Sequence, residues 1–297
     1  MKKLLIKLTA CLSLSVLSAT AFAAEEGLTL PNDNLPRLTG GYLEVSMQRG
    51  MQVYVNNCLG CHALSFQRYQ RTANDLGIPE DVMMENMIFS DAKIGDLMTN
   101  NMSVEAAANW FGAAPPDLSV VARARGTHWL YNYFRAFYVD ETRPYGVNNS
   151  VFKDVGMPHV LEEMQGLQAK TDEVKNLENE ISYAQADIAA AKKQLEEGGN
   201  SSALNKTINE SETVIYEAEA KLTEISKAGN YFKIVKEGQL SPAEFNQAMI
   251  DLTYFLEYVG EPIKRERERL GIWVLLFITF FGFVAYLLKK EYWKDIH

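Results

Sequence analysis

One pentapeptide constrains this chain more than any other feature: Cys58-Leu59-Gly60-Cys61-His62. Two thiols on one turn of backbone, followed at once by an imidazole, form the C-x-x-C-H pattern to which one haem c is covalently attached. Each thiol makes a thioether to the porphyrin, and the histidine reaches the iron from the same side. The alternatives are a redox dithiol, which needs a βαβ context, and half of a zinc site, which needs a second ligand pair.

Residues 1–23 have the pattern of a secretory signal peptide. Lysines precede an apolar run from Leu8 to Leu17, and Ala21-Phe22-Ala23 fits the small-x-small cleavage rule. A lipoprotein signal ending at Cys11 is the alternative, but its apolar region would be very short. Cleavage after Ala23 removes three lysines and no acids, so the net charge changes from −9 to −12. This acidity argues against nucleic acid as a partner and favours a basic protein.

A second apolar segment, Gly271 to Leu288, carries no charge. As a helix it would span about 27 Å, close to the hydrocarbon core of a bilayer at about 30 Å. A buried core helix is the alternative, but such a helix usually shows an apolar stripe rather than continuous apolarity. With the signal peptide before it, the pattern predicts a single-pass protein of the bacterial inner membrane. Residues 264–288 would be linker and anchor, the main domain would be periplasmic, and residues 289–297 would form a cytoplasmic tail.

Two helices are predicted to frame the haem site. Apolar residues at helical spacing predict a helix over 41–57 that leads straight into Cys58. Ser241-Pro242-Ala243-Glu244 has the pattern of a capping box, and an apolar helix face follows it as far as Gly260. We expect these helices to pack together and close the haem pocket, and the helical periodicities predict an all-α protein.

The segment Gly156-Met157-Pro158 provides the best sixth ligand for iron. A methionine before proline is held away from helical geometry, so its thioether projects from a loop. His159 and His128 are the alternatives, and Met157 can also serve packing alone. The methionines at helical spacing are expected to fill core: Met83, Met84 and Met87.

A proline pair, Pro115-Pro116, stiffens an extended segment ahead of Asp117-Leu118-Ser119. We expect Asp117 or Ser119 to cap the helix that follows. That helix carries Arg123 and Arg125, whose planar donors suit anionic haem propionates, with ordinary surface positions as the alternative. The dense aromatic stretch after it suits a haem wall, or equally any core.

Residues 165–230 differ in composition from the segments on either side, 24–164 and 231–263, which we assign to the c-type haem domain. Apolar residues repeat every seven positions, with seam residues between them, on both sides of Gly198-Gly199-Asn200-Ser201. The repeats predict an antiparallel helical hairpin about 45 Å long. It could dock a partner, although we favour inert elaboration or subunit packing.

In combination these motifs resemble the cytochrome c1 family, the haem subunit of ubiquinol:cytochrome c oxidoreductase, in its bacterial form. The resemblance rests on the cysteine and histidine motif and on three further segments, which are Pro115 to Ser119 with Arg123-Ala124-Arg125, Gly156-Met157-Pro158, and Gly260-Glu261-Pro262 before the C-terminal anchor. It covers the mature chain apart from the hairpin.

The resemblance implies a cytochrome c-like haem domain with assigned residue roles. Cys58 and Cys61 would carry the thioethers, and His62 and Met157 would be the axial ligands to iron. Pro116 would belong to the haem-binding residues. Arg125 with Tyr131 would hold a propionate, with Arg123 as the alternative.

The implied activity is one-electron transfer by a subunit that is not a catalyst alone. A Rieske iron–sulfur protein would deliver the electron, and a soluble or membrane-bound cytochrome c would accept it, in a complex with cytochrome b. The alternatives are a free-standing or oxidase-linked membrane cytochrome c, and a haem enzyme or gas sensor with an open sixth site. The lipid bilayer is a further expected partner, through the C-terminal anchor.

Overall fold

The computed structural model describes residues 35–294, so the predicted signal peptide lies outside the described residues. The structure is mainly helical, which confirms the predicted all-α class. Small antiparallel sheets, which the sequence did not predict, join parts of the chain between the helices. In the described residues these sheets pair β1 (Leu64–Arg68) with β2 (Leu97–Met98), β3 (Phe137–Val139) with β4 (Val147–Asn149), and β5 (Gly166–Lys170) with β6 (Phe232–Glu237).

Two long helices, α2 (Gly41–Asn57) and α11 (Pro242–Gly260), form the centre of the globular body. Both were predicted, including the capping box at the start of α11. They pack so closely that a Cβ atom added at Gly50 would lie 2.0 Å from the carbonyl oxygen of Asp251. The Asp251 side chain is itself buried and accepts hydrogen bonds of 2.6 Å from Ser46 and from Arg49. The expected packing of α11 on the helix before Cys58 is therefore confirmed.

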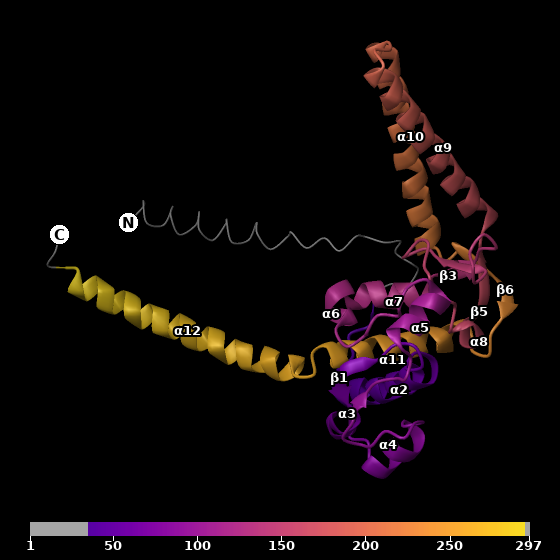
Figure 1. The fold of residues 1–297 in the computed structure, drawn as a ribbon. Helices are drawn as coiled ribbons and strands as arrows, with labels where there is room; N and C mark the ends of the chain where they lie inside the picture. Colours follow the sequence, from indigo (N-terminus) through magenta and orange to yellow (C-terminus); the bar gives the residue numbers. More distant parts are fainter. Residues whose placement is uncertain (1–34, 295–297) are drawn as a thin grey trace.

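Six shorter helices complete the body. They are α3 (Tyr69–Leu76), α4 (Glu80–Asn86), α5 (Val104–Phe111), α6 (Val121–Arg125), α7 (Thr127–Arg135) and α8 (Glu162–Gln165). Met83 of α4 is fully buried, as predicted, whereas Met84 is 43% exposed. Helices α6 and α7 lie along α11 on the side away from α3 and α4 (Figure 1).

A helical hairpin of α9 (Asp172–Glu196) and α10 (Ser201–Lys227) projects from this body (Figure 1). Its helices pack through predicted seam residues that are buried, among them Val174, Leu177, Ala218 and Leu222. The helical part is shorter than the predicted span 165–230, because residues 166–170 form strand β5 and pair with β6. The helical hairpin is therefore connected to the body through the two-stranded sheet of β5 and β6.

The last helix, α12 (Lys264–Tyr292), follows α11 after residues 261–263 and extends away from the body (Figure 1). It is long and apolar enough to cross a membrane, and no other helix in residues 35–294 is. Two ion pairs connect its first turns to the end of α11: Lys264 with Glu257 at 2.6 Å and Arg267 with Glu261 at 2.5 Å. The apolar segment thus begins at a defined position relative to the globular body.

Candidate cofactor site

A cavity of about 350 Å³ lies between the end of α2, helices α6, α7 and α11, and the loop between β4 and α8. Its size falls within the roughly 300–1,000 Å³ of typical cofactor pockets. Most of its lining is apolar, including Phe111, Leu130, Phe134, Val160 and Leu256. Such a lining keeps water away from a cofactor that the polar side chains of the cavity bind.

Cys58, Cys61 and His62 all line one wall of this cavity. The backbone after α2 forms a tight turn, in which the amides of Cys61 and His62 donate to the carbonyl of Cys58 over 3.0 and 2.8 Å. Tyr54 fixes the end of the turn by donating its hydroxyl to the carbonyl of His62 over 2.5 Å. Burial, with the neighbouring Cys61, raises the pKa of the Cys58 thiol to about 12. Both thiols thus line the same cavity as the imidazole of His62, which directly follows Cys61 in the chain.

The imidazole of His62 is oriented by Pro116. Its Nδ1 lies 2.7 Å from the carbonyl oxygen of Pro116, which also lines the cavity. This hydrogen bond places the ring proton on Nδ1 and leaves the lone pair of Nε2 available to a metal. Burial lowers the pKa of His62 and so favours the neutral, ligating form.

The prediction that Asp117 or Ser119 caps the following helix is wrong. Helix α6 has only five residues, and its N-cap is Val120, without a side-chain hydrogen bond. Asp117 instead accepts the amide of Ser65 over 2.8 Å, and Ser119 accepts the amide of Phe66 over 3.1 Å. These bonds to β1 hold the segment that presents the Pro116 carbonyl, so both side chains act on His62 indirectly.

Met157 lines the cavity, whereas the alternative ligands His128 and His159 are not among its lining residues. His159 is buried and stacks on Phe137 with ring centroids 4.8 Å apart, and burial lowers its pKa to about 4. The sulfur of Met157 lies 3.3 Å from the hydroxyl of Tyr133. Tyr133 was not singled out from the sequence, because an aromatic residue in an aromatic stretch carries no signal of that contact.

Of the residues predicted to hold a propionate, Arg125 lines the cavity, and Arg123 and Tyr131 do not. Helical geometry explains the difference, since residues four apart share a face: Val121 and Arg125 line the cavity from α6. Tyr131 faces elsewhere on α7, where the guanidinium of Arg135 lies 4.4 Å from its ring centroid.

The guanidinium of Arg125 lies over two aromatic rings at the cavity. It is 5.1 Å from the ring centroid of Trp129 and 5.7 Å from that of Phe152. Within residues 35–294, no carboxylate lies within 4.0 Å of it. A charged donor without a carboxylate partner suits an anionic group of a bound cofactor.

The donor set fits a covalently attached haem. Two thiols and an imidazole whose Nδ1 is hydrogen-bonded lie on one wall, and a thioether lines the same cavity. Arg125 also lies at it, and among residues 35–294 it has no carboxylate partner. Soft sulfur and imidazole ligands suit haem iron, and the apolar walls suit the porphyrin faces.

Comparison with known proteins identifies a family that agrees with this donor set. The sequence profile of the Cytochrome C1 family matches residues 35–190 and 232–296. The chain is 43% identical to cytochrome c1 of Allochromatium vinosum, over 86% of each protein. It is 36% identical to the ammonia monooxygenase gamma subunit of Nitrosomonas europaea, over 85% of this chain and 84% of that protein.

A third relative, cytochrome b/c1 of Bradyrhizobium diazoefficiens, is 27% identical over 92% of this chain and 37% of its own length. Residues 191–231, which the family profile leaves unmatched, include the end of α9, all of α10 and the residues that follow it. The profile thus covers both parts of the body that surround the cavity. The chain belongs to the cytochrome c1 family.

Proposed function

We propose that this chain is the haem-bearing subunit of a quinol:cytochrome c oxidoreductase, accepting one electron from a Rieske iron–sulfur protein and passing it to a cytochrome c. The family supports electron transfer within a cytochrome bc complex, and the name of the relative cytochrome b/c1 supports a cytochrome b partner. The observation that carries the proposal is one cavity lined by Cys58, Cys61, His62 and Met157.

Each residue has a proposed role. One haem c would be held covalently by Cys58 and Cys61, with His62 and Met157 as axial ligands. Bound there, it supplies reversible one-electron chemistry of iron. The Pro116 carbonyl orients His62, and Met157, which lines the same cavity, would leave the bound iron no open position for a substrate.

The surroundings of the site support transfer without a bound substrate. Apolar walls limit water, which reduces the reorganisation that accompanies each change of charge. Arg125 would neutralise a propionate, and we prefer it to Arg123 and Tyr131 because only Arg125 of the three lines the cavity. The proposal also covers the location of the protein. The haem domain would lie on the periplasmic side, and α12 would be the single anchor in the inner membrane.

The ligand assignment is tested by Met157→His in the haem-loaded, full-length protein. Ferric haem with methionine sulfur has a weak far-red absorption band. We expect this band in the parent, its loss in the variant, and a lower midpoint potential, because imidazole stabilises the ferric state more than thioether does. Met84→His is the matched control, since Met84 is exposed and not among the cavity-lining residues.

Two outcomes would reject parts of the proposal. A parent without the band whose reduced form binds carbon monoxide readily would support an open sixth site, and thus the enzyme or sensor. Purification from native membranes without a cytochrome b would support a free-standing or oxidase-linked cytochrome instead.

A further inference from the structure

The loop that carries Met157 contains an unfavourable backbone conformation. Residues 150–157, here called the Met157 loop, follow strand β4 and end at the predicted ligand. Within it, Asp154 has a φ of 61°, and no other non-glycine residue in the described chain has a positive φ. Left-handed backbone is disfavoured for residues with a Cβ atom, so neighbouring groups have to hold Asp154 in place.

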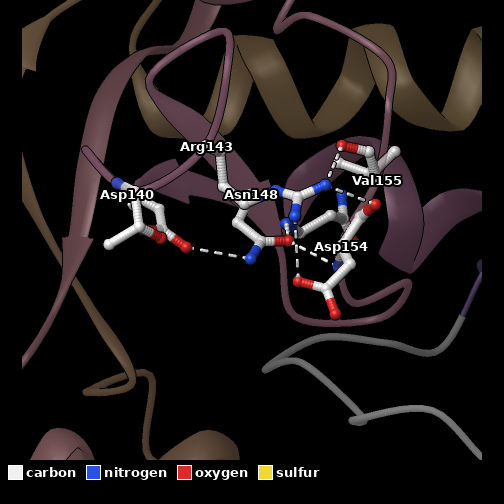
Figure 2. A network of polar contacts seen from close by, with 7 residues as sticks. Asp140, Arg143, Asn148, Asp154 and Val155 are labelled. Atoms are coloured by element: carbon white, nitrogen blue, oxygen red, sulfur yellow. Dashed lines mark hydrogen bonds and ion pairs between the residues drawn. The ribbon is translucent and has the colours of Figure 1, made fainter. Parts of the chain in front are cut away.

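Two side chains from the β3–β4 hairpin and its turn hold Asp154 (Figure 2). Arg143 donates from Nη2 to the carbonyl of Asp154 over 2.7 Å, and Asn148 accepts the amide of Asp154 over 2.9 Å. Asn148 is in turn fixed by the carboxylate of Asp140, which accepts its amide group over 2.9 Å. Both backbone polar groups of the strained residue are therefore satisfied by side chains of one rigid hairpin.

Arg143 also reaches the next residue of the loop. The same Nη2 lies 3.4 Å from the carbonyl of Val155, as Figure 2 shows. Val155, Gly156 and Met157 all line the cavity. The guanidinium thus fixes successive carbonyls immediately before the segment that faces the cofactor.

The ion pair between Arg143 and Asp154 contributes less than these backbone bonds. Its nitrogen–oxygen distance is 3.4 Å, and the Asp154 side chain is 60% exposed. Exposed ion pairs at such distances stabilise little, whereas the hydrogen bond from the charged Nη2 to the Asp154 carbonyl is shorter, at 2.7 Å, and stronger. The role of Arg143 therefore depends on the hydrogen bonds that its charged Nη2 donates to the backbone, rather than on its ion pair with the Asp154 carboxylate.

From this geometry we propose that Arg143 is a positioning residue that keeps Met157 at the sixth position of the haem iron by fixing the backbone of Asp154 and Val155. The inference rests on the proposed function, since it takes Met157 as the ligand. Without Arg143 the loop relaxes at Asp154, and the thioether leaves the iron for part of the time.

The test compares four variants of the haem-loaded, full-length protein. Arg143→Gln removes the charged guanidinium, Arg143→Lys keeps the charge but places it on a differently positioned nitrogen, and Asp154→Asn removes the ion pair but tolerates left-handed backbone. Arg71→Gln is the matched control, because it removes an arginine from an ion pair of 3.2 Å on α3. The readouts are the far-red band and the fraction of reduced protein that binds carbon monoxide.

We expect Arg143→Gln to increase the fraction that binds carbon monoxide about tenfold, as loss of a hydrogen bond from a charged donor implies. Its far-red band should weaken, Arg143→Lys should be intermediate, and Asp154→Asn and Arg71→Gln should match the parent. The inference would be overturned if Arg143→Gln kept the far-red band and bound carbon monoxide to the same extent as Arg71→Gln. It would also be overturned if Asp154→Asn lost the far-red band as fully as Arg143→Gln.

The inference and the proposed function can fail separately. A parent without the band rejects Met157 as the ligand, whatever the variants do. If Arg143→Gln does not accumulate with haem, Arg143→Lys decides: increased carbon monoxide binding supports the inference, and parent-like binding overturns it.

Discussion

The hydroxyl of Tyr133 lies 3.3 Å from the sulfur of Met157, and both side chains line the same cavity. Tyr133 is held in place by stacking on Trp129, with ring centroids 4.9 Å apart. Burial raises the pKa of Tyr133, so its hydroxyl keeps the proton that it donates. The sulfur predicted to bind iron therefore has a neutral hydrogen-bond donor beside it.

This contact predicts a change in midpoint potential. A hydrogen bond to the thioether withdraws electron density from the sulfur and so disfavours ferric iron. Tyr133→Phe should therefore lower the midpoint potential while the far-red band of methionine ligation persists, which redox titration and absorption spectra will measure. Tyr258→Phe is the control, because that buried hydroxyl bonds to Asp75 and neither residue lines the cavity. A potential that stays equal or rises in Tyr133→Phe would contradict the prediction.

A pair of glycines in α2 gives a second prediction. A Cβ atom at Gly50 would meet the Asp251 carbonyl at 2.0 Å, whereas one at Gly41 would have no neighbour within 4 Å. Gly50→Ala should separate α2 from α11 and lower the free energy of unfolding by about 3 kcal/mol. Gly41→Ala should leave it unchanged or raise it by up to about 1 kcal/mol.

Chemical denaturation of the two glycine variants measures this difference, and covalent haem content gives a second readout. Haem content should fall in Gly50→Ala, because α2 leads into Cys58 and α11 contributes Leu256 to the cavity. Equal stability of the two variants would show that the helices can adjust their distance.

The hairpin yields a third prediction. Its buried residues form a cluster separate from the main core, made up of Val174, Leu177, Ala218, Leu222 and Tyr231. Replacing residues 184–215 by the native turn, Gly198 to Ser201, keeps this cluster and the strands β5 and β6. Haem content, far-red band and midpoint potential should match those of the parent, and loss of any of them would show that the outer hairpin supports the site.

Elements with a periodic sequence pattern could be predicted, as α2, α11 and the hairpin show. Their apolar spacing repeats over several turns, and the capping box at Ser241 is a local motif. The strands β5 and β6 could not be predicted, because β6 is mostly exposed and the two strands pair across the whole helical hairpin.

The site was predictable only in part. The motif at Cys58 and the Met157-Pro158 pair are local signals, whereas the contacts of Pro116 with His62 and of Arg143 with Asp154 join a side chain to a distant backbone group. Such contacts depend on tertiary structure and leave no spacing in the sequence. For the same reason, the sequence could not show that Arg125 rather than Arg123 lines the cavity. The face of α6 that meets the cavity is set by packing on α7 and α11.

The packing of α2 on α11 also sets an order of events during biosynthesis. Ser46 and Asp251 are in contact although they lie 205 positions apart in the chain. At about 5–20 residues per second, translation takes roughly 10–40 s to cover that distance. For nearly all of that interval Cys58 and Cys61 have been made, but the α11 wall of their cavity is incomplete. Under the proposed covalent attachment, an enzyme that joins haem to these thiols during export would meet an open half-pocket until α11 is complete.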